Sequence, residues 1–154
     1  MPWFGANLLD PEGYGAALAS LFIQQVLQPE PDSRVIGFKE IRHIKLKPDV
    51  LFAYLDFIRA QFDGAKIIFN RRNHQAAARS THWKIVSDAV HQKKLAKTEN
   101  AFKTYAAHHS EDTIIVDYDA YTKDGAALAP LFDFLGEPYD AAIVKEVLGQ
   151  RLEH

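Results

Sequence analysis

The chain of 154 residues contains no cysteine and no long apolar run. The absence of cysteine excludes a disulfide framework, thiolate metal sites and cysteine nucleophiles. No run approaches the roughly 18 consecutive apolar residues that a membrane-spanning helix requires, and the first residues lack the basic-then-apolar pattern of a secretory signal. We therefore expect a globular, cytoplasmic protein that does not insert into a membrane.

The chain also has no strong excess of positive over negative charge, or of negative over positive. Lysine and arginine number 18 against 20 aspartate and glutamate residues, so the formal net charge is −2. This balance is not typical of a protein that binds nucleic acids or membrane surfaces generally. A GxxxxGKS or GxxxxGKT phosphate loop is absent as well, which disfavours a nucleotide-dependent kinase.

What is present is the composition of an ordinary globular domain, with 47% hydrophobic and 25% charged residues. Such a length suits one domain with its own core. We treat residues 1–151 as a single domain and interpret residues 152–154 as a tag remnant.

Short runs of β-branched and aromatic residues alternate with helical patterns along the chain. The runs Arg34–Glu40, Ile67–Phe69 and Thr113–Tyr118 predict three buried strands. Their alternation with helices is typical of an α/β domain with a mainly parallel sheet of about three strands, flanked by helices. In such sheets, ligands bind beyond the carboxyl ends of the strands.

Two of the helical patterns have well-defined ends. Asp10 and Pro11 predict the start of the first helix, with aspartate as the N-cap and proline at the first position. A later helix over Ala126–Leu135 should end at Gly136. In the first helix, spacings of three and four predict an inward face made of Tyr14, Leu18, Leu21, Phe22 and Val26.

The stretch Ala65–Ser80, AKIIFNRRNHQAAARS, joins a predicted strand to a basic turn and an alanine-rich helix, for which Asn73 is a suitable N-cap. Arg71 and Arg72 thus stand between the end of a strand and the start of a helix. Free helix amides and bidentate guanidinium groups at such a place can bind phosphate or sulfate. The same layout begins many α/β crossovers, so a structural arginine pair is an equal alternative.

Charged residues also follow two other predicted strands. Lys39, Glu40 and Arg42 should lie at the same sheet edge as the two arginines, because the carboxyl ends of parallel strands meet there. A salt-bridge cluster is nearly as well supported for these three residues as a catalytic role. The carboxylates Asp117 and Asp119 could bind a metal, but turn and capping roles fit them better, so we expect no metal site.

Four segments carry a resemblance to a known family. They are GFKEIR at Gly37–Arg42, AKIIFNRRNHQAAARS at Ala65–Ser80, IIVDYDAY at Ile114–Tyr121 and LFDFLGEPYD at Leu131–Asp140. In order and spacing, from about residue 7 to residue 149, the chain resembles the later part of a sulfotransferase of the bacterial sulfotransferase-like branch.

The resemblance implies an enzyme that transfers a sulfuryl group from 3′-phosphoadenosine-5′-phosphosulfate (PAPS) to a hydroxyl or amine of a small-molecule or glycan acceptor. It implies that Arg72 and Ser80 bind the 3′-phosphate of this donor, with Arg71 and Asn73 beside them. The chemistry agrees, since a dianionic phosphate favours a bidentate arginine and a hydroxyl donor.

The resemblance also suggests catalytic residues. Lys39 falls near a basic residue that would stabilise the bridging oxygen as the sulfuryl group leaves. Glu40 falls loosely on the position of a base for the acceptor, and Arg42 would bind substrate.

One part of the family pattern is missing from this chain. Family members begin with a strand and a loop rich in Gly, Ser and Thr that holds the 5′-phosphosulfate. The closest glycines here, Gly13 and Gly15, lie in or beside a predicted helix and have no basic partner. We therefore expect a fragment with a partial P-loop-like sulfotransferase fold. A missing central strand would leave an open sheet edge, which favours a homo-oligomer or cover by the N-terminal segment.

Two functions stay open at this point. The first is a PAPS-dependent sulfotransferase that is active when the missing loop is supplied. The second is a non-catalytic sulfotransferase-like module that keeps the fold and the 3′-phosphate pocket for binding or interaction. No motif identifies the acceptor, because variable loops build its pocket.

Overall fold

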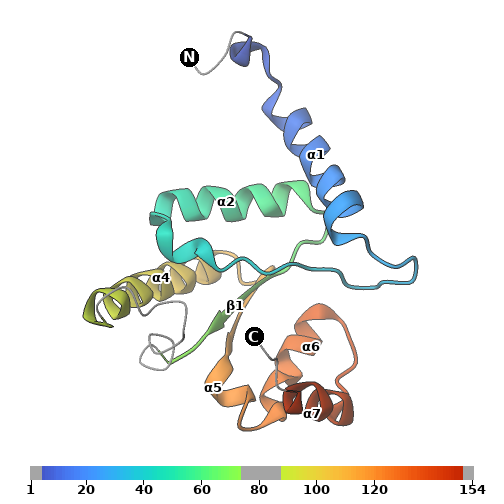
Figure 1. The fold of residues 1–154 in the computed structure, drawn as a ribbon, viewed down its shortest axis with the longest axis vertical. Coiled ribbons are helices and arrows are strands. Elements are labelled where there is room, and N and C mark those ends of the chain that lie inside the picture. The colour runs from blue at the N-terminus through green and yellow to red at the C-terminus, as the bar shows by residue number, and fades with distance from the viewer. Residues whose placement is uncertain (1–4, 74–87, 151–154) are drawn as a thin grey trace.

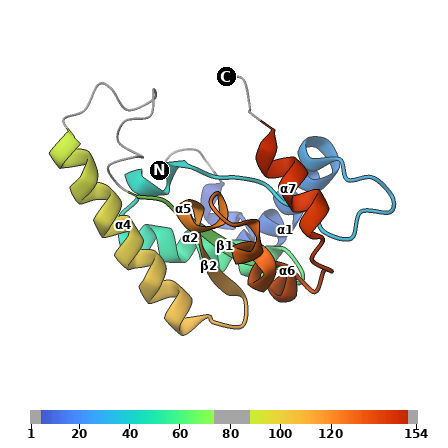
Figure 2. The same ribbon diagram turned by 90° about the horizontal axis from the view of Figure 1, so that it is seen from below.

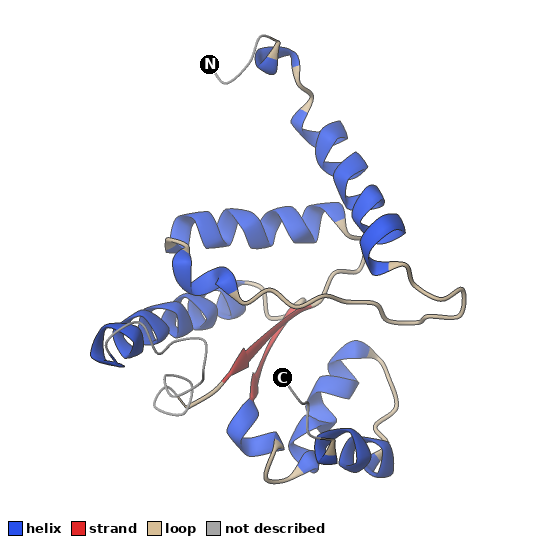
Figure 3. Ribbon diagram, viewed as in Figure 1, coloured by secondary structure: helices blue, strands red, loops and turns tan. Residues whose placement is uncertain are grey.

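The computed structural model describes residues 5–73 and 88–150. This part of the chain forms six helices and a two-stranded parallel sheet (Figures 1 and 3). The helices are α1 (Pro11–Phe22), α2 (Pro48–Gln61), α4 (Asp88–His108), α5 (Tyr118–Tyr121), α6 (Ala129–Leu135) and α7 (Ala141–Gly149). The strands are β1 (Ile67–Arg71) and β2 (Thr113–Asp117), and short helical turns are η1 (Ala6–Leu8), η2 (Ile23–Leu27), η3 (Arg42–Lys45) and η5 (Gly125–Leu128).

The two strands run parallel and in full register. Ile67 pairs with Thr113 at one end, and Arg71 pairs with Asp117 at the other. Both carboxyl ends therefore lie at the same edge of the sheet. The predicted α/β class with a parallel sheet flanked by helices is confirmed for the described residues.

The predicted strand Arg34–Glu40 is wrong. This segment links η2 to η3 without regular structure (Figure 3), and no described strand lies beside it to share ladder hydrogen bonds. Its apolar residues Val35, Ile36 and Phe38 are exposed, although the Phe38 ring packs edge-to-face on Phe22 at 5.1 Å. The described sheet thus has two strands, because strand-type residues become a strand only beside a partner.

The core lies on one face of β1, under α2 and α4. Figure 2 shows α2 and α4 against the strands. The buried side chains come from all three elements: Leu51 and Leu55 of α2, Ile67 and Phe69 of β1, and Ala101 and Tyr105 of α4. Between the two buried β1 residues, Ile68 points to the other face and is 40% exposed. This alternation fixes which side of the sheet α2 and α4 cover.

Helix α1 begins as the sequence predicts but buries a different face. Asp10 caps it, with Oδ1 and Oδ2 accepting from the amides of Glu12 and Gly13 at 3.2 and 3.1 Å. Its buried residues are Gly15 and Ala19, whereas most of the predicted stripe is exposed. A Cβ at Gly15 would lie 3.0 Å from the Phe57 ring, so small residues let α1 approach α2 closely.

The C-terminal helices follow directly from β2. Asp117 ends the strand and caps α5, its Oδ1 accepting from the amides of Asp119 and Ala120 at 3.0 and 3.2 Å, so the predicted capping role of Asp117 is confirmed. The predicted end of α6 at Gly136 is also confirmed, with a φ of 71°.

Within residues 5–73 and 88–150, no helix has the length and apolar character needed to cross a membrane.

Candidate functional site

A hollow of about 400 Å³ lies at the carboxyl ends of the two strands. Its lining residues are Arg71, Arg72 and Asn73 after β1, Asp117 and Asp119 after β2, and Glu99 of α4. The parallel register brings them together, since Arg71 stands opposite Asp117 on the last paired position. Three residues that the sequence singles out, Arg71, Arg72 and Asn73, thus share one surface with three carboxylates.

Arg71 is held on two sides by carboxylates. Its Nη2 lies 2.9 Å from Asp117 Oδ2, its Nε donates to the same oxygen at 3.1 Å, and its Nη1 lies 3.5 Å from Glu99 Oε1. Burial would raise the pKa of Asp117, but hydrogen bonds from the Ala120 amide and from Arg71 outweigh it and lower that pKa. Arg71 therefore joins β1, β2 and α4, which fits the structural alternative for this arginine.

Arg72 has a different environment. Its guanidinium carbon lies 4.6 Å from the centre of the Tyr118 ring, a cation–π contact. Arg72 is exposed and forms no ion pair with a described residue. A guanidinium in a cation–π contact keeps its charge, because the ring supplies no carboxylate to neutralise it. Arg72 thus lines the hollow with its charge unpaired by any described carboxylate.

Asn73 ties the end of β1 to the segment after β2. Its backbone amide donates to Asp119 Oδ2 at 2.6 Å. The predicted N-cap role of Asn73 depends on residues 74–87, which lie outside the described residues, and Ser80 falls in the same range. The Ser80 hydroxyl, which is expected to bind the 3′-phosphate together with Arg72, therefore lies outside the described residues.

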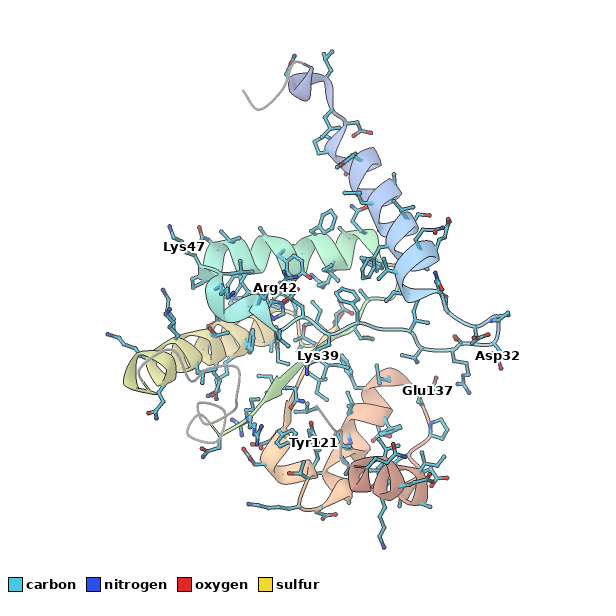
Figure 4. All side chains as sticks on the ribbon, in the orientation of Figure 1. Asp32, Lys39, Arg42, Lys47, Tyr121 and Glu137 are labelled. Atoms are coloured by element: carbon cyan, nitrogen blue, oxygen red, sulfur yellow. The ribbon has the colours of Figure 1, made fainter. Side chains whose placement is uncertain are left out.

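Lys39, Glu40 and Arg42 do not line the hollow. Lys39 and Glu40 lie just before η3, and Arg42 is its first residue; Figure 4 labels Lys39 and Arg42. Glu40 Oε1 accepts from the Arg42 amide at 2.6 Å and from Arg42 Nε at 3.1 Å, while Oε2 accepts from Nη2 at 3.0 Å. Lys39 is exposed and forms no ion pair with a described residue. The geometry thus matches a salt bridge between Glu40 and Arg42 that does not include Lys39.

The salt bridge changes the chemistry of Glu40. The side-chain hydrogen bonds from Arg42, supported by its backbone amide, lower the pKa of Glu40 to about 2. A general base works best with a pKa near the operating pH, so Glu40 in this arrangement is a weak base. Its predicted role as the acceptor base is not supported by this geometry.

The sequence did not single out two residues at the site: Glu99, which lines the hollow, and Tyr118, whose ring centre lies 4.6 Å from the Arg72 guanidinium carbon. Glu99 lies on the long polar helix α4, where no motif distinguishes it from the other charged residues. Tyr118 is the last residue of the predicted strand Thr113–Tyr118. Only the packing of α4 beside β1 brings Glu99 to Arg71. No group of three or more metal-ligating side chains that could hold an ion occurs in the described part of the chain.

Comparisons of the chain with protein-family models, with curated proteins and with solved structures find no match. A function therefore has to be inferred from the residues of this chain and their geometry.

Proposed function

We propose that this chain is the part of a PAPS-dependent sulfotransferase that binds the 3′-phosphate of the donor, through Arg72. The observation that carries the proposal is the position of Arg72, which follows β1 at the carboxyl edge of a parallel sheet and rests on Tyr118 without a carboxylate partner among the described residues. Ligands of parallel α/β sheets bind at this edge.

The surrounding hollow supports this proposal in size, and part of its negative charge is offset by cations. Its volume of about 400 Å³ lies within the roughly 300–1,000 Å³ of sites for small molecules and cofactors. Its carboxylates already have donors: Asp117 and Glu99 pair with Arg71, and Asp119 accepts from the Asn73 amide. Arg71, together with Lys103 on Glu99, offsets the charges of Asp117 and Glu99, whereas Asp119 is hydrogen-bonded to a neutral amide and keeps its negative charge.

In sulfuryl transfer, an acceptor oxygen or nitrogen attacks sulfur while the bond from sulfur to the bridging phosphate oxygen breaks. A cation near that oxygen would stabilise the leaving group. Lys39 is the proposed cation, since it is exposed and has no ion-pair partner among the described residues. Glu40 and Arg42, bonded to each other, would hold the segment that carries Lys39.

Calorimetric titration with 3′,5′-adenosine bisphosphate tests the 3′-phosphate site. The wild-type chain should bind, and Arg72→Ala should weaken binding about 10- to 100-fold, because a hydrogen-bonded charge contributes about 1.5–3 kcal/mol. Arg34→Ala is the matched control, because Arg34 is an exposed arginine paired with Glu137 outside the hollow. Absence of binding by wild type, or equal binding by wild type and Arg72→Ala, would contradict the proposal.

A non-catalytic binding module is the second candidate function. It is favoured by the low pKa of Glu40, about 2, and by the lack of a Gly-, Ser- and Thr-rich loop for the 5′-phosphosulfate in this sequence. An assay of sulfuryl transfer from labelled PAPS by the full-length reading frame separates the two. Nucleotide binding without transfer to any acceptor would favour the module.

A further inference from the structure

A second pocket, of about 180 Å³, lies between α4 and the junction of η3 with α2. Four lysines line it: Lys45 and Lys47 from the junction, and Lys94 and Lys97 from α4. The same α4 face also supplies Thr98 and Ala101. This basic pocket shares no lining residue with the hollow at the strand ends.

The charge of the basic pocket is uncompensated by the described residues. No acidic side chain is among its described lining residues, and none of the four lysines forms an ion pair with a described residue. Other lysines of the chain behave differently, since Lys66 pairs with Asp112 and Lys103 pairs with Glu99. In a chain of net charge −2, four like charges around one small pocket repel each other unless an anion joins them.

The walls of the basic pocket strengthen its field. Leu51 and Ala101, which are 1% and 7% exposed, form part of the lining. A cleft with charges of one sign and apolar walls focuses the potential and concentrates counter-ions. Helix α2 also begins here, and its N-cap Lys47 makes no side-chain capping hydrogen bond. The positive end of the helix dipole therefore adds to the lysine charge.

His43 supplies a further unsatisfied polar group. Its ring lines the basic pocket and packs near Tyr54 and Phe102, with centroids at 5.8 and 6.0 Å. Its Nε2 is buried and has no hydrogen-bond partner among the described residues. Buried polar atoms are normally paired with protein, water or an ion. The Thr98 hydroxyl, by contrast, already donates to the Lys94 carbonyl at 3.0 Å.

We propose that the basic pocket binds one phosphate or sulfate group, held by Lys45, Lys47, Lys94 and Lys97. The volume of about 180 Å³ is below the roughly 300–1,000 Å³ of pockets for drug-sized ligands, so it suits a single tetrahedral oxyanion. The group is either a free ion or the end of a larger ligand. The site does not depend on the proposed sulfotransferase function.

Titration of the ¹⁵N-labelled chain, followed by amide chemical shifts, tests this site. Inorganic phosphate, inorganic sulfate and methyl phosphate are added at constant ionic strength by replacing chloride. We expect saturable shifts at both walls of the basic pocket, Lys45–Leu51 and Lys94–Ala101. Tighter binding of methyl phosphate than of inorganic phosphate would indicate the end of a larger ligand, and the reverse order would indicate the free ion.

The double variant Lys47→Gln and Lys97→Gln should weaken this binding about tenfold or more, because two charge-assisted contacts are lost. Lys123→Gln and Lys145→Gln are matched controls, since both lysines are exposed and neither lines the basic pocket. Arg72→Ala should leave these shifts unchanged, and the lysine variants should leave binding of 3′,5′-adenosine bisphosphate unchanged. Linear, unsaturated shifts, or equal shifts in wild type and the double variant, would overturn the proposal.

Discussion

Tyr105 is one of the most enclosed side chains of the core, with 2% of its surface exposed. Its hydroxyl donates to Asp56 Oδ1 at 2.7 Å, which links α4 to α2, and its ring packs on Phe52 and His109. Burial, and then the hydrogen bond to the Asp56 carboxylate, raise the pKa of Tyr105 to about 12. Ionisation of this phenol is therefore less favourable in the folded chain than in the unfolded one.

We expect the stability of the chain to fall at high pH through Tyr105. Its folded pKa of about 12 lies above the ordinary value of 10.0. This contribution, about 2–3 kcal/mol, is fully present below about pH 10 and is lost as the pH rises through about 12. Urea unfolding at a series of alkaline pH values measures it.

Two tyrosine variants test the assignment of this alkaline loss. Tyr105→Phe should lower stability at neutral pH by about 1 kcal/mol through the lost hydrogen bond, but should flatten the alkaline slope. Some slope will remain, since burial also raises the pKa of Tyr54. Tyr14→Phe, at an exposed tyrosine of α1, should keep the wild-type slope. An unchanged slope in Tyr105→Phe would show that another group titrates.

Arg71 and Arg72 show how two adjacent, identical residues acquire different roles. Arg71 forms ion pairs with Asp117 and Glu99, whereas Arg72 contacts the Tyr118 ring and has no ion pair with a described residue. The sequence left the anion site and the structural pair as equal alternatives. The ion pairs of Arg71 fit the structural alternative, and the anion site at Arg72 stays a prediction.

At the scale of elements, helix ends are set by short-range chemistry. Helix α6 ends at Gly136, whose φ of 71° lies in the left-handed region, with no atom within 4 Å of a Cβ built there. Any cost of a side chain at this position therefore comes from the backbone conformation and not from crowding.

Gly136→Ala should destabilise the chain by about 1 kcal/mol, because a non-glycine residue is strained in the left-handed region. Gly149→Ala is the matched control: Gly149 is the last residue of α7, has no atom within 4 Å of a built Cβ, and has no positive φ. That variant should be as stable as wild type or slightly more stable. Chemical denaturation measures both, and equal effects of the two substitutions would refute the conformational explanation.

For the whole molecule, the distribution of apolar surface is uneven. Figure 1 shows α1 extending away from the sheet, and only Gly15 and Ala19 are buried along it. Leu18, Leu21 and Val26 are exposed on α1 and η2. Large exposed apolar regions mark association surfaces in many proteins. The two-stranded sheet of the described residues also has edges that no described strand covers, and open edges favour association.

We therefore expect the chain to self-associate, with α1 in the contact. Sedimentation velocity at increasing concentration should show a rising average sedimentation coefficient. Leu21→Glu should reduce this rise, because it places a charge on a side chain that is 55% exposed on α1. Val147→Glu, at a side chain that is 59% exposed on α7, is the control and should behave as wild type. A wild-type coefficient that does not change with concentration would contradict the expectation.

The sequence by itself determined the features that depend on neighbours along the chain. The apolar pattern located β1 and β2, although each is a strand only because it pairs with the other. The cap at Asp10 and the end of α6 at Gly136 follow from local hydrogen bonding and backbone preference. These interactions join residues within a few positions of each other, so the chain encodes them directly.

Only the tertiary structure decided the features that depend on contacts between residues far apart in the sequence. Arg71 meets Asp117, which lies 46 residues away, and this pairing separates its role from that of Arg72. The segment Arg34–Glu40 has strand-type residues but no adjacent strand, so its pattern alone predicts the wrong structure. Helix α1 buries Gly15 and Ala19 while most of its apolar stripe is exposed, because α2 approaches closely at Gly15. Contacts between elements set these outcomes, and no local pattern contains them.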